Sequence, residues 1–520
     1  MNKARGTLIL LSLFMSFVAC GGGGNGIFPT PTPTPIPTPT QKVSVTVSST
    51  KSQTLNLAMS TSFQPAEWDY QFFTNHPTAT GPLGSLNPAH VRIQAISQAV
   101  PQTTTGWSFS MLDDIVQPVL SVGDHSPEFQ VAVAPSFMYL PNTKQFTDGT
   151  FATFGTYAAN LVSYYNGPGI PNPSGGANLI SPVANSYPIK YWGIHNEPNI
   201  NGFGKGVGGN TTDPYTPSDY VTLYNTVVPK MQAANPDPSH PLTFVAVELA
   251  DFGTWENDFL PPFVSGVTAH VDVVATHFYS TCNQSDTDQV VFNTIPNFAA
   301  GVKNIYSILQ KNPMLVNVPV WITENNVNAD FQGANGFSTC NPTQKFVDDT
   351  RGSSAFFAAW RPYLFSQVGQ AGAEALYHWD FAADAQYGEL DDQTGNYRLS
   401  YWVDKALQQY FPNPPGGDIL QLTNSDNTNV EALAVKNADG SVVVMVANHA
   451  VNSIGDNNGT GSPREVTVDV SALGNFSSGT ELTIDANTSV TNGPTAQNVT
   501  FAPQMTFTMN GYGVVFLKLQ

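Results

Sequence analysis

Charged residues are scarce in this chain of 520 residues. They make up 11% of the sequence, whereas an average soluble protein has about 25%. Basic residues are also fewer than acidic ones, 19 against 38, so the formal net charge is −19. Binding to a phosphate backbone depends on Lys and Arg, which displace the condensed counterions. The composition therefore argues against nucleic acid as a partner and favours an uncharged one.

Long apolar runs are absent beyond the start of the chain. Lys3 and Arg5 precede an apolar run that is too short to span a bilayer, which is typical of an export signal over residues 1–19. The run ends in Phe17-Val18-Ala19-Cys20, which resembles a bacterial lipobox, with Phe17 where Leu is usual. We therefore predict lipidation of Cys20 and a protein anchored in the outer membrane or at the cell surface. Ordinary signal cleavage, with a periplasmic or secreted product, is the alternative.

A spacer is expected directly after the anchor. Four glycines follow Cys20, and Pro occupies every second position from residue 29 to residue 39. This alternation enforces an extended, polyproline-like backbone. Residues 20–41 are therefore expected to form a semi-rigid stalk, and the lipid would be the protein's only contact with the membrane.

Cysteine is nearly absent, since only Cys282 and Cys340 follow Cys20. Two thiols without a histidine cluster cannot complete a zinc shell, and in an exported protein an even pair favours a bridge. Each lies shortly after one of two consecutive expected strands. We predict a Cys282–Cys340 disulfide, and no metal or organic cofactor is expected.

The length suits one large domain and one smaller domain. Residues 55–412 alternate short apolar runs with helical patterns, as βαβ units do around a parallel sheet. The strands expected here are Leu55–Met59, His90–Gln94, Phe129–Ala134, Lys190–Ile194, Thr243–Val247, Val271–Thr276, Val318–Thr323 and Ala375–Trp379. The expected helices are Phe109–Val122, Phe151–Tyr165, Ser218–Ala234, Phe292–Leu309, Ser354–Gln370 and Tyr401–Tyr410.

The pattern changes at residues 417–520, where short β-branched segments are separated by Gly, Asn and Asp turns. This is typical of an antiparallel sandwich. Residues 42–54 show the same alternation and are a candidate for an additional strand of that sheet. The strands expected are Val430–Val435, Val442–Ala447, Glu465–Val470, Thr480–Asp485, Gln497–Phe501 and Gly513–Leu519. The predicted fold class is α/β: a (β/α)8 barrel followed by a C-terminal antiparallel β-sandwich, as a monomer.

Two glutamates stand at the ends of predicted barrel strands, where functional groups of such barrels gather. Glu197 lies in His195-Asn196-Glu197-Pro198-Asn199 after the fourth strand, and Glu324 lies in Thr323-Glu324-Asn325 after the seventh. Hydrolysis of a glycosidic bond needs two carboxyl groups that flank the bond, one as acid and one as nucleophile or base. Asn196 can offer an amide N–H to a sugar hydroxyl.

The motif Asn196-Glu197-Pro198 together with Glu324 resembles the retaining glycoside hydrolases that carry the acid/base after strand four and the nucleophile after strand seven. Thr323-Glu324 and the trailing sandwich look most like glycoside hydrolase family 39. The resemblance implies a hydrolase that acts on a carbohydrate substrate, with Glu197 as acid/base and Glu324 as nucleophile. His195 departs from the pattern, because relatives often have Trp there.

The same resemblance assigns roles to four further residues. Arg92 would steady the nucleophile, His277 or Tyr279 would hydrogen-bond it or a sugar, and Trp379 would form an aromatic floor. Each has a structural alternative: an ion pair for Arg92, rim polar groups for His277 and Tyr279, and core packing for Trp379. Two other carboxylates near strand ends are candidates for sugar binding only, namely Glu248 and Asp380.

Two other functions remain open at this stage. An inactive surface lipoprotein that only binds carbohydrate would share the stalk and an aromatic cleft, but it would not need both glutamates. A transglycosylase would share every catalytic residue and differ only in the acceptor. The sugar, the linkage and endo or exo action reside in loops whose conformation the sequence does not give.

Overall fold

The computed structural model describes residues 41–63, 71–95, 99–122, 127–183, 188–250, 255–412 and 416–520. The predicted signal peptide, Cys20 and most of the stalk lie outside the described residues. Within the described part of the chain, no helix combines the length and the apolar character needed to cross a membrane.

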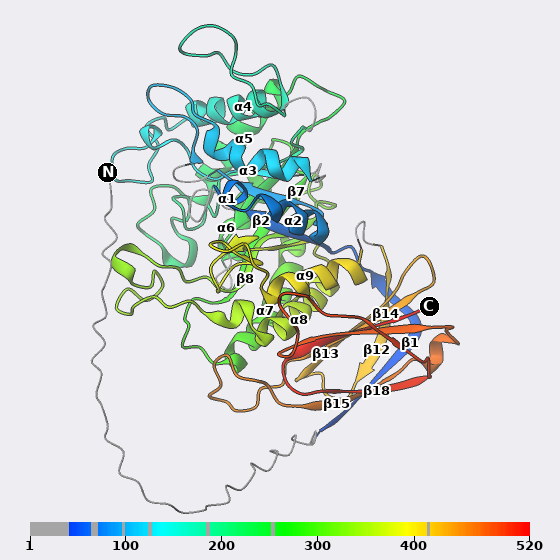
Figure 1. Ribbon diagram of the computed structural model, residues 1–520. Helices are drawn as coiled ribbons and strands as arrows, with labels where there is room; N and C mark the ends of the chain where they lie inside the picture. The colour runs from blue at the N-terminus through cyan, green and yellow to red at the C-terminus, as the bar shows by residue number, and fades with distance from the viewer. Residues whose placement is uncertain are drawn as a thin grey trace, which may run out of the picture. The chain divides into compact units, whose positions relative to one another are not determined.

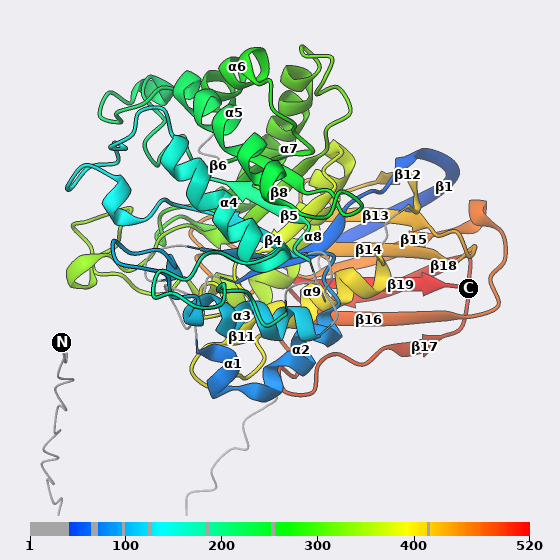
Figure 2. The same cartoon turned by 90° about the horizontal axis from the view of Figure 1, so that it is seen from above.

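Eight parallel strands close into a barrel, because the first pairs with the last as well as with the second. The predicted barrel is therefore confirmed (Figures 1 and 2). Its strands are β2 (Ala58–Phe63), β3 (Val91–Gln94), β4 (Glu128–Val131), β5 (Tyr191–Ile194), β6 (Thr243–Leu249), β7 (Val273–Thr281), β8 (Val320–Asn328) and β9 (Ala375–His378). The first strand begins three residues later than expected.

The shift of β2 has a physical cause. Leu55 and Leu57, the most apolar residues of the expected strand, are buried before it starts, where they face Gly369. The strand itself carries three hydroxyl residues, two of which find partners inside the barrel: the Thr61 hydroxyl donates to Glu389 Oε2 at 2.7 Å, and Ser62 donates to a backbone carbonyl. A prediction from hydrophobicity alone therefore starts this strand too early along the chain.

Helices surround the barrel, and most agree with expectation. They are α3 (Ser110–Ser121), α4 (Ala152–Asn166), α5 (Pro217–Ala234), α6 (Glu256–Gly266), α7 (Asp288–Leu309), α8 (Ala355–Ala371) and α9 (Leu399–Tyr410), with the short α1 (Phe72–Asn75) and α2 (Thr80–Leu86) near the start. Helix α5 begins as its sequence indicates, since Asp219 accepts the Thr216 N–H at 2.7 Å and Pro217 opens the helix. Helix α6 was not expected, because Pro261 and Pro262 lie inside it.

The C-terminal strands form one nine-stranded sheet in the order β17-β16-β19-β14-β13-β12-β1-β15-β18. The pairing is mostly antiparallel, but β1 runs parallel to β15. In both views β1, drawn in blue, lies among the orange and red strands (Figures 1 and 2). The strands are β1 (Lys42–Thr54), β12 (Asp418–Asn424), β13 (Val430–Lys436), β14 (Val442–Asn448), β15 (Arg464–Asp469), β16 (Gly479–Asp485), β17 (Gln497–Val499), β18 (Gln504–Met509) and β19 (Gly513–Leu519).

The sheet has two apolar faces. One encloses a core of its own, mainly valines that include Val45, Val444 and Val466. The other packs on the barrel through α8, and its Leu433, Met445 and Phe516 belong to the same cluster as the barrel core. Burial on both faces explains why β13, β14 and β19 read as nearly continuous apolar runs.

Candidate active site

Glu197 and Glu324 meet at the end of the barrel where the strands terminate. Glu197 follows β5, and Glu324 lies within β8. A carboxylate oxygen of each glutamate and a ring nitrogen of His277 all lie within 4.8 Å of one another. The Glu197 side chain is 18% exposed and that of Glu324 is 7% exposed, so Glu197 is the more accessible of the two.

An irregular turn directs Glu197 into the site. The backbone angle φ is +64° at His195 and +45° at Glu197, a region that costs a non-glycine residue on the order of 1–3 kcal/mol. Hydrogen bonds hold the turn in place: the N–H groups of His195 and Asn196 donate to Val131 and Ala132. The His195 ring packs edge-on against Phe203, and burial lowers its pKa to about 4, which favours the uncharged form.

The Glu324 carboxylate receives hydrogen bonds at both oxygens. Arg92 Nη1 donates to Oε1 at 2.9 Å, and the Tyr279 hydroxyl donates to Oε2 at 3.0 Å. Burial raises the pKa of Glu324, and Glu197 acts in the same direction, whereas the charges of His277 and Arg92 lower it. Fixed donors on both oxygens hold this carboxylate in one orientation.

His277 stands between the two glutamates. Its Nδ1 lies 2.9 Å from Glu197 Oε1 and 3.5 Å from Glu324 Oε2. Burial acts to lower the pKa of His277, but the surrounding carboxylates of Glu324, Glu197 and Glu248 prevail and raise it to about 9. At neutral pH His277 is therefore a cation whose Nδ1–H donates to Glu197.

Arg92 is completely buried beneath this pair and binds more than Glu324. Its guanidinium also donates to Asn196 Oδ1 at 2.7 Å and to Glu248 Oε2 at 2.6 and 2.9 Å. Glu128 lies 3.7 Å from its Nε. Burial raises the pKa of Glu128 to about 8, with the Glu248 charge acting in the same direction.

Trp379 lies beside the carboxylates in a small aromatic cluster with Tyr279 and Tyr387. Its side chain is mostly buried, and the Arg92 guanidinium lies 6.0 Å from its ring centre. The peptide bond from Trp379 to Asp380 is cis. Asp380 itself is buried, and its carboxylate accepts the Ala382 N–H.

The predicted disulfide is present. Cys282, just after β7, is bonded to Cys340 in the long loop that follows β8. The bond closes a loop between residues 58 positions apart. A second contact reinforces it, since the Cys340 N–H donates to Asp330 at 3.0 Å. The β8 loop is thereby held against the end of β7, next to Tyr279 and Glu324.

The structure thus brings together all seven residues predicted for the site: Glu197, Glu324, Arg92, Asn196, His277, Tyr279 and Trp379. Sequence reasoning missed Glu128 and did not foresee that Glu248 is completely buried against Arg92. A signal was available in both cases. Each is a charged residue in or beside an expected buried strand, and such a charge requires a partner inside the barrel.

Two clusters contain residue types that bind metals. The first is Glu197, His277 and Glu324, and the second is His378, Glu389 and Asp404. In the first, Nδ1 of His277 already faces both carboxylates, 2.9 Å from Glu197 Oε1 and 3.5 Å from Glu324 Oε2. In the second, Nδ1 of His378 faces Asp404 and Nε2 faces a carbonyl oxygen, so both nitrogens are engaged. The donor sets therefore suit hydrogen-bond networks better than a metal ion.

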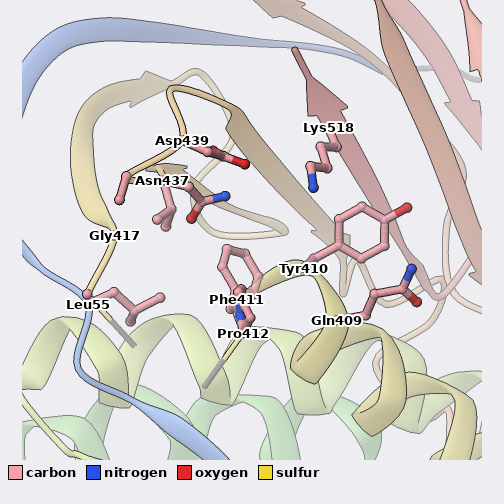
Figure 3. A pocket seen from close by; sticks show the side chains of 12 residues that line it. Leu55, Gln409, Tyr410, Phe411, Pro412, Gly417, Asn437, Asp439 and Lys518 are labelled. Atoms are coloured by element: carbon pink, nitrogen blue, oxygen red, sulfur yellow. The ribbon is translucent and has the colours of Figure 1, made fainter. Parts of the chain in front are cut away.

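A separate hollow of about 350 Å³ lies away from these residues. Figure 3 shows Asp439 and Lys518 above Tyr410 and Phe411, with Leu55 to one side. Leu55, one of the lining residues, precedes the start of β2 and so lies at the end of the barrel opposite Glu197 and Glu324. Neither glutamate lines it, and it is not part of the candidate active site.

No protein-family model matches the chain, and no curated protein matches its sequence. Solved structures do share the fold. The GH39 enzyme from Xanthomonas axonopodis pv. citri has a TM-score of 0.59 and 13% identity, over 92% of this chain and 97% of that one. The GH51 arabinofuranosidase from the same organism has a TM-score of 0.61 and 13% identity, over 92% of this chain and 100% of that one.

A third similar structure is the GH30 endoxylanase from Clostridium papyrosolvens C71. Its TM-score is 0.54 at 16% identity, over 92% of this chain and 99% of that one. At such identities the likeness establishes the fold, a (β/α)8 barrel with an attached β-sheet domain.

Proposed function

We propose that this protein is a retaining glycoside hydrolase that cleaves O-glycosidic bonds of a polysaccharide or oligosaccharide by double displacement. One observation carries the proposal: carboxylate oxygens of Glu197 and Glu324 approach within 4.8 Å at the strand ends of a (β/α)8 barrel. Retaining enzymes separate their two carboxyl groups by about 5–5.5 Å, whereas inverting enzymes leave about 6.5–9.5 Å for a water molecule. The short separation favours direct attack by one carboxylate.

The surroundings of the two carboxyl groups support different roles. Arg92 and Tyr279 donate hydrogen bonds to Glu324, which favour its anionic form, the form that would attack the anomeric carbon. Glu197 is more exposed and would protonate the leaving oxygen. As Glu197 loses its proton, the charged His277 N–H, 2.9 Å away, stabilises the new carboxylate.

The second half of the reaction uses the same groups in reverse. Glu197, now a carboxylate, takes a proton from a water molecule. The oxygen of that water attacks the anomeric carbon of the glycosyl-enzyme, and the bond between this carbon and Glu324 breaks. The Oδ1 of Asn196 is occupied by Arg92, so its Nδ2–H groups are the ones that can donate to a sugar hydroxyl. The acidic protein would favour an uncharged glycan.

Product stereochemistry tests the proposal without knowledge of the natural sugar. Activated aryl glycosides are the first probes, among them xylosides and arabinofuranosides, because structurally similar proteins include an endoxylanase and an arabinofuranosidase. Proton NMR of the first product should show the anomeric configuration of the substrate. Inversion would contradict double displacement, and transfer of sugar to another sugar in place of water would identify a transglycosylase.

Alanine variants separate the roles of the two glutamates. Glu324→Ala should abolish turnover, and added azide should give a glycosyl azide of inverted configuration. Glu197→Ala should spare activated aryl glycosides, and azide should there give a product of retained configuration. Glu374→Ala, at the opposite end of β9, is the matched control and should keep its kcat/KM. Near-normal rates in both active-site variants would contradict the assignment of the two glutamates, and wild-type protein that binds carbohydrate without cleaving it would favour the inactive alternative.

A further inference from the structure

Glu248 occupies a point of β6 where the strand is irregular. The angle φ is +76° at Val247 and +44° at Glu248, and the pairing of β6 with β7 shifts register between Ala246 and Leu249. Such bulges redirect a side chain. The Tyr220 hydroxyl accepts the Val247 N–H at 2.9 Å, so the irregular segment has a fixed internal partner.

The neighbouring strand leaves room for this carboxylate. Gly193 in β5 faces Glu248, and a Cβ atom added there would lie 2.0 Å from Glu248 Oε1. The absence of a side chain at Gly193 is therefore a condition for the position of Glu248. A bulge in one strand and a glycine in the next together form a built site for a buried carboxylate.

Glu248 contacts three residues of the active site. Its Oε2 accepts two hydrogen bonds from Arg92, at 2.6 and 2.9 Å, and lies 4.0 Å from His277 Nε2. Its backbone carbonyl accepts the Glu197 N–H at 3.1 Å. Glu248 has no exposed surface, so a sugar cannot reach it. It can act on the reaction only through its neighbours.

The charge of Glu248 opposes that of Arg92, and Arg92 also acts on Glu324. Arg92 makes two hydrogen bonds to Glu248 and one to Glu324. Without the Glu248 anion, the full guanidinium charge would stabilise the Glu324 carboxylate and make it a weaker nucleophile. The titratable or charged groups facing Glu248 are Arg92, Glu128, His195, Tyr220 and His277.

We propose that Glu248 is a positioning residue for the reaction. Its buried anion orients Arg92 and His277 and offsets the positive charges that these two residues place beside Glu197 and Glu324. The proposal rests on the function proposed above for Glu197 and Glu324. Its test includes one measurement that does not need activity.

The test compares Glu248→Gln, which removes the charge but keeps the shape, with Glu128→Gln. The control removes a second buried carboxyl group near Arg92, one whose pKa of about 8 leaves it protonated below neutral pH. The first readout is the pKa of His277, followed by NMR of isotope-labelled histidine. Loss of the Glu248 anion should lower this pKa by about one unit or more, and the control should lower it less.

The second readout is the pH profile of kcat/KM, whose acid limb reports ionisation of Glu324. In Glu248→Gln this limb should move to lower pH by about one unit, because Arg92 then favours the Glu324 anion more strongly. We expect kcat to fall on the order of tenfold with little change in KM. In Glu128→Gln the acid limb should stay in place.

Glu248→Asp keeps the charge at a greater distance and should give intermediate values for both readouts. If Glu248→Gln does not fold, this variant decides the question alone. Wild-type values of the His277 pKa and of the acid limb would overturn the proposal, as would a fall in kcat with an unmoved acid limb. If the wild-type protein cleaves no glycoside, the proposed function fails, but the His277 titration still tests the electrostatic role of Glu248.

Discussion

Replacing Glu431 by Gln should change the pH dependence of stability in a defined direction. Glu431 lies on β13 and faces α8, where Ser366 and Gln367 donate hydrogen bonds to its carboxylate. Burial raises its pKa from 4.5 to about 7, although both hydrogen bonds act to lower it. The folded state therefore binds this proton more tightly than the unfolded state.

The sign and size of the effect follow from the two pKa values. The stabilising contribution is complete below pH 4.5, declines as the pH rises and is lost above about 7. With about 1.4 kcal/mol per pH unit, the free energy of unfolding should lose on the order of 3 kcal/mol over this interval. Glu431→Gln cannot ionise, so it should be more stable than the wild type at pH 8 and nearly equal to it at pH 4.5.

Thermal and urea unfolding at pH 4.5, 6 and 8 would measure the difference between variant and wild type. The test uses the difference in the free energy of unfolding between variant and wild type at each pH. The net charge of −19 makes the stability of both proteins depend on pH, and this shared dependence cancels in the difference. Glu481→Gln, at a half-exposed position on β16, controls for loss of one acidic charge. A stability difference that is independent of pH, or larger at pH 4.5 than at pH 8, would refute the reasoning.

Two further substitutions test the site itself. Tyr279→Phe removes the hydroxyl that donates to Glu324 at 3.0 Å. A hydrogen bond to a charged group contributes about 1.5–3 kcal/mol. The kcat/KM on an aryl glycoside should therefore fall about 10- to 100-fold. A change below twofold would contradict this. Gly193→Ala should displace Glu248 and strongly reduce activity, whereas Gly301→Ala in α7, whose added Cβ would meet nothing closer than 3.9 Å, should keep activity and thermal stability. Equal behaviour of the two alanine variants would contradict the steric argument.

Much of the barrel could be predicted because its strands are buried on both faces and read as short apolar runs. The segments that begin at Thr243 and Ala375 were predicted from the correct first residue. Prediction failed where polarity or proline hid an element. Strand β2 carries buried hydroxyl residues, α6 contains Pro261 and Pro262, and the edge strand β18 is too exposed to show an apolar run.

The meeting of Glu197 and Glu324 could be predicted because both lie in short motifs at strand ends. The buried network beneath them could not be derived in the same way. Arg92 was expected to steady the nucleophile, but its stronger pairing with Glu248 depends on contacts between strands β3 and β6, which are not neighbours in the barrel. No spacing along the chain encodes such a contact across the barrel interior.

Irregular strand pairing explains why the direction of the side chains in the site could not be predicted from the apolar pattern. Along β7 and β8, Thr276 pairs with Ile322 but His277 pairs with Glu324, so one residue of β8 is skipped where the candidate site begins. A shift of one residue reverses which side chains point into the barrel. Both faces of these strands are buried, so the sequence shows no apolar–polar alternation from which the shift could be predicted. The shift places His277 beside Glu324, and the bulge at Glu248 acts likewise on β6. Irregular pairing on these strands thus helps to bring His277 and three glutamates together. Glu197, Glu248 and Glu324 come from separate parts of the chain.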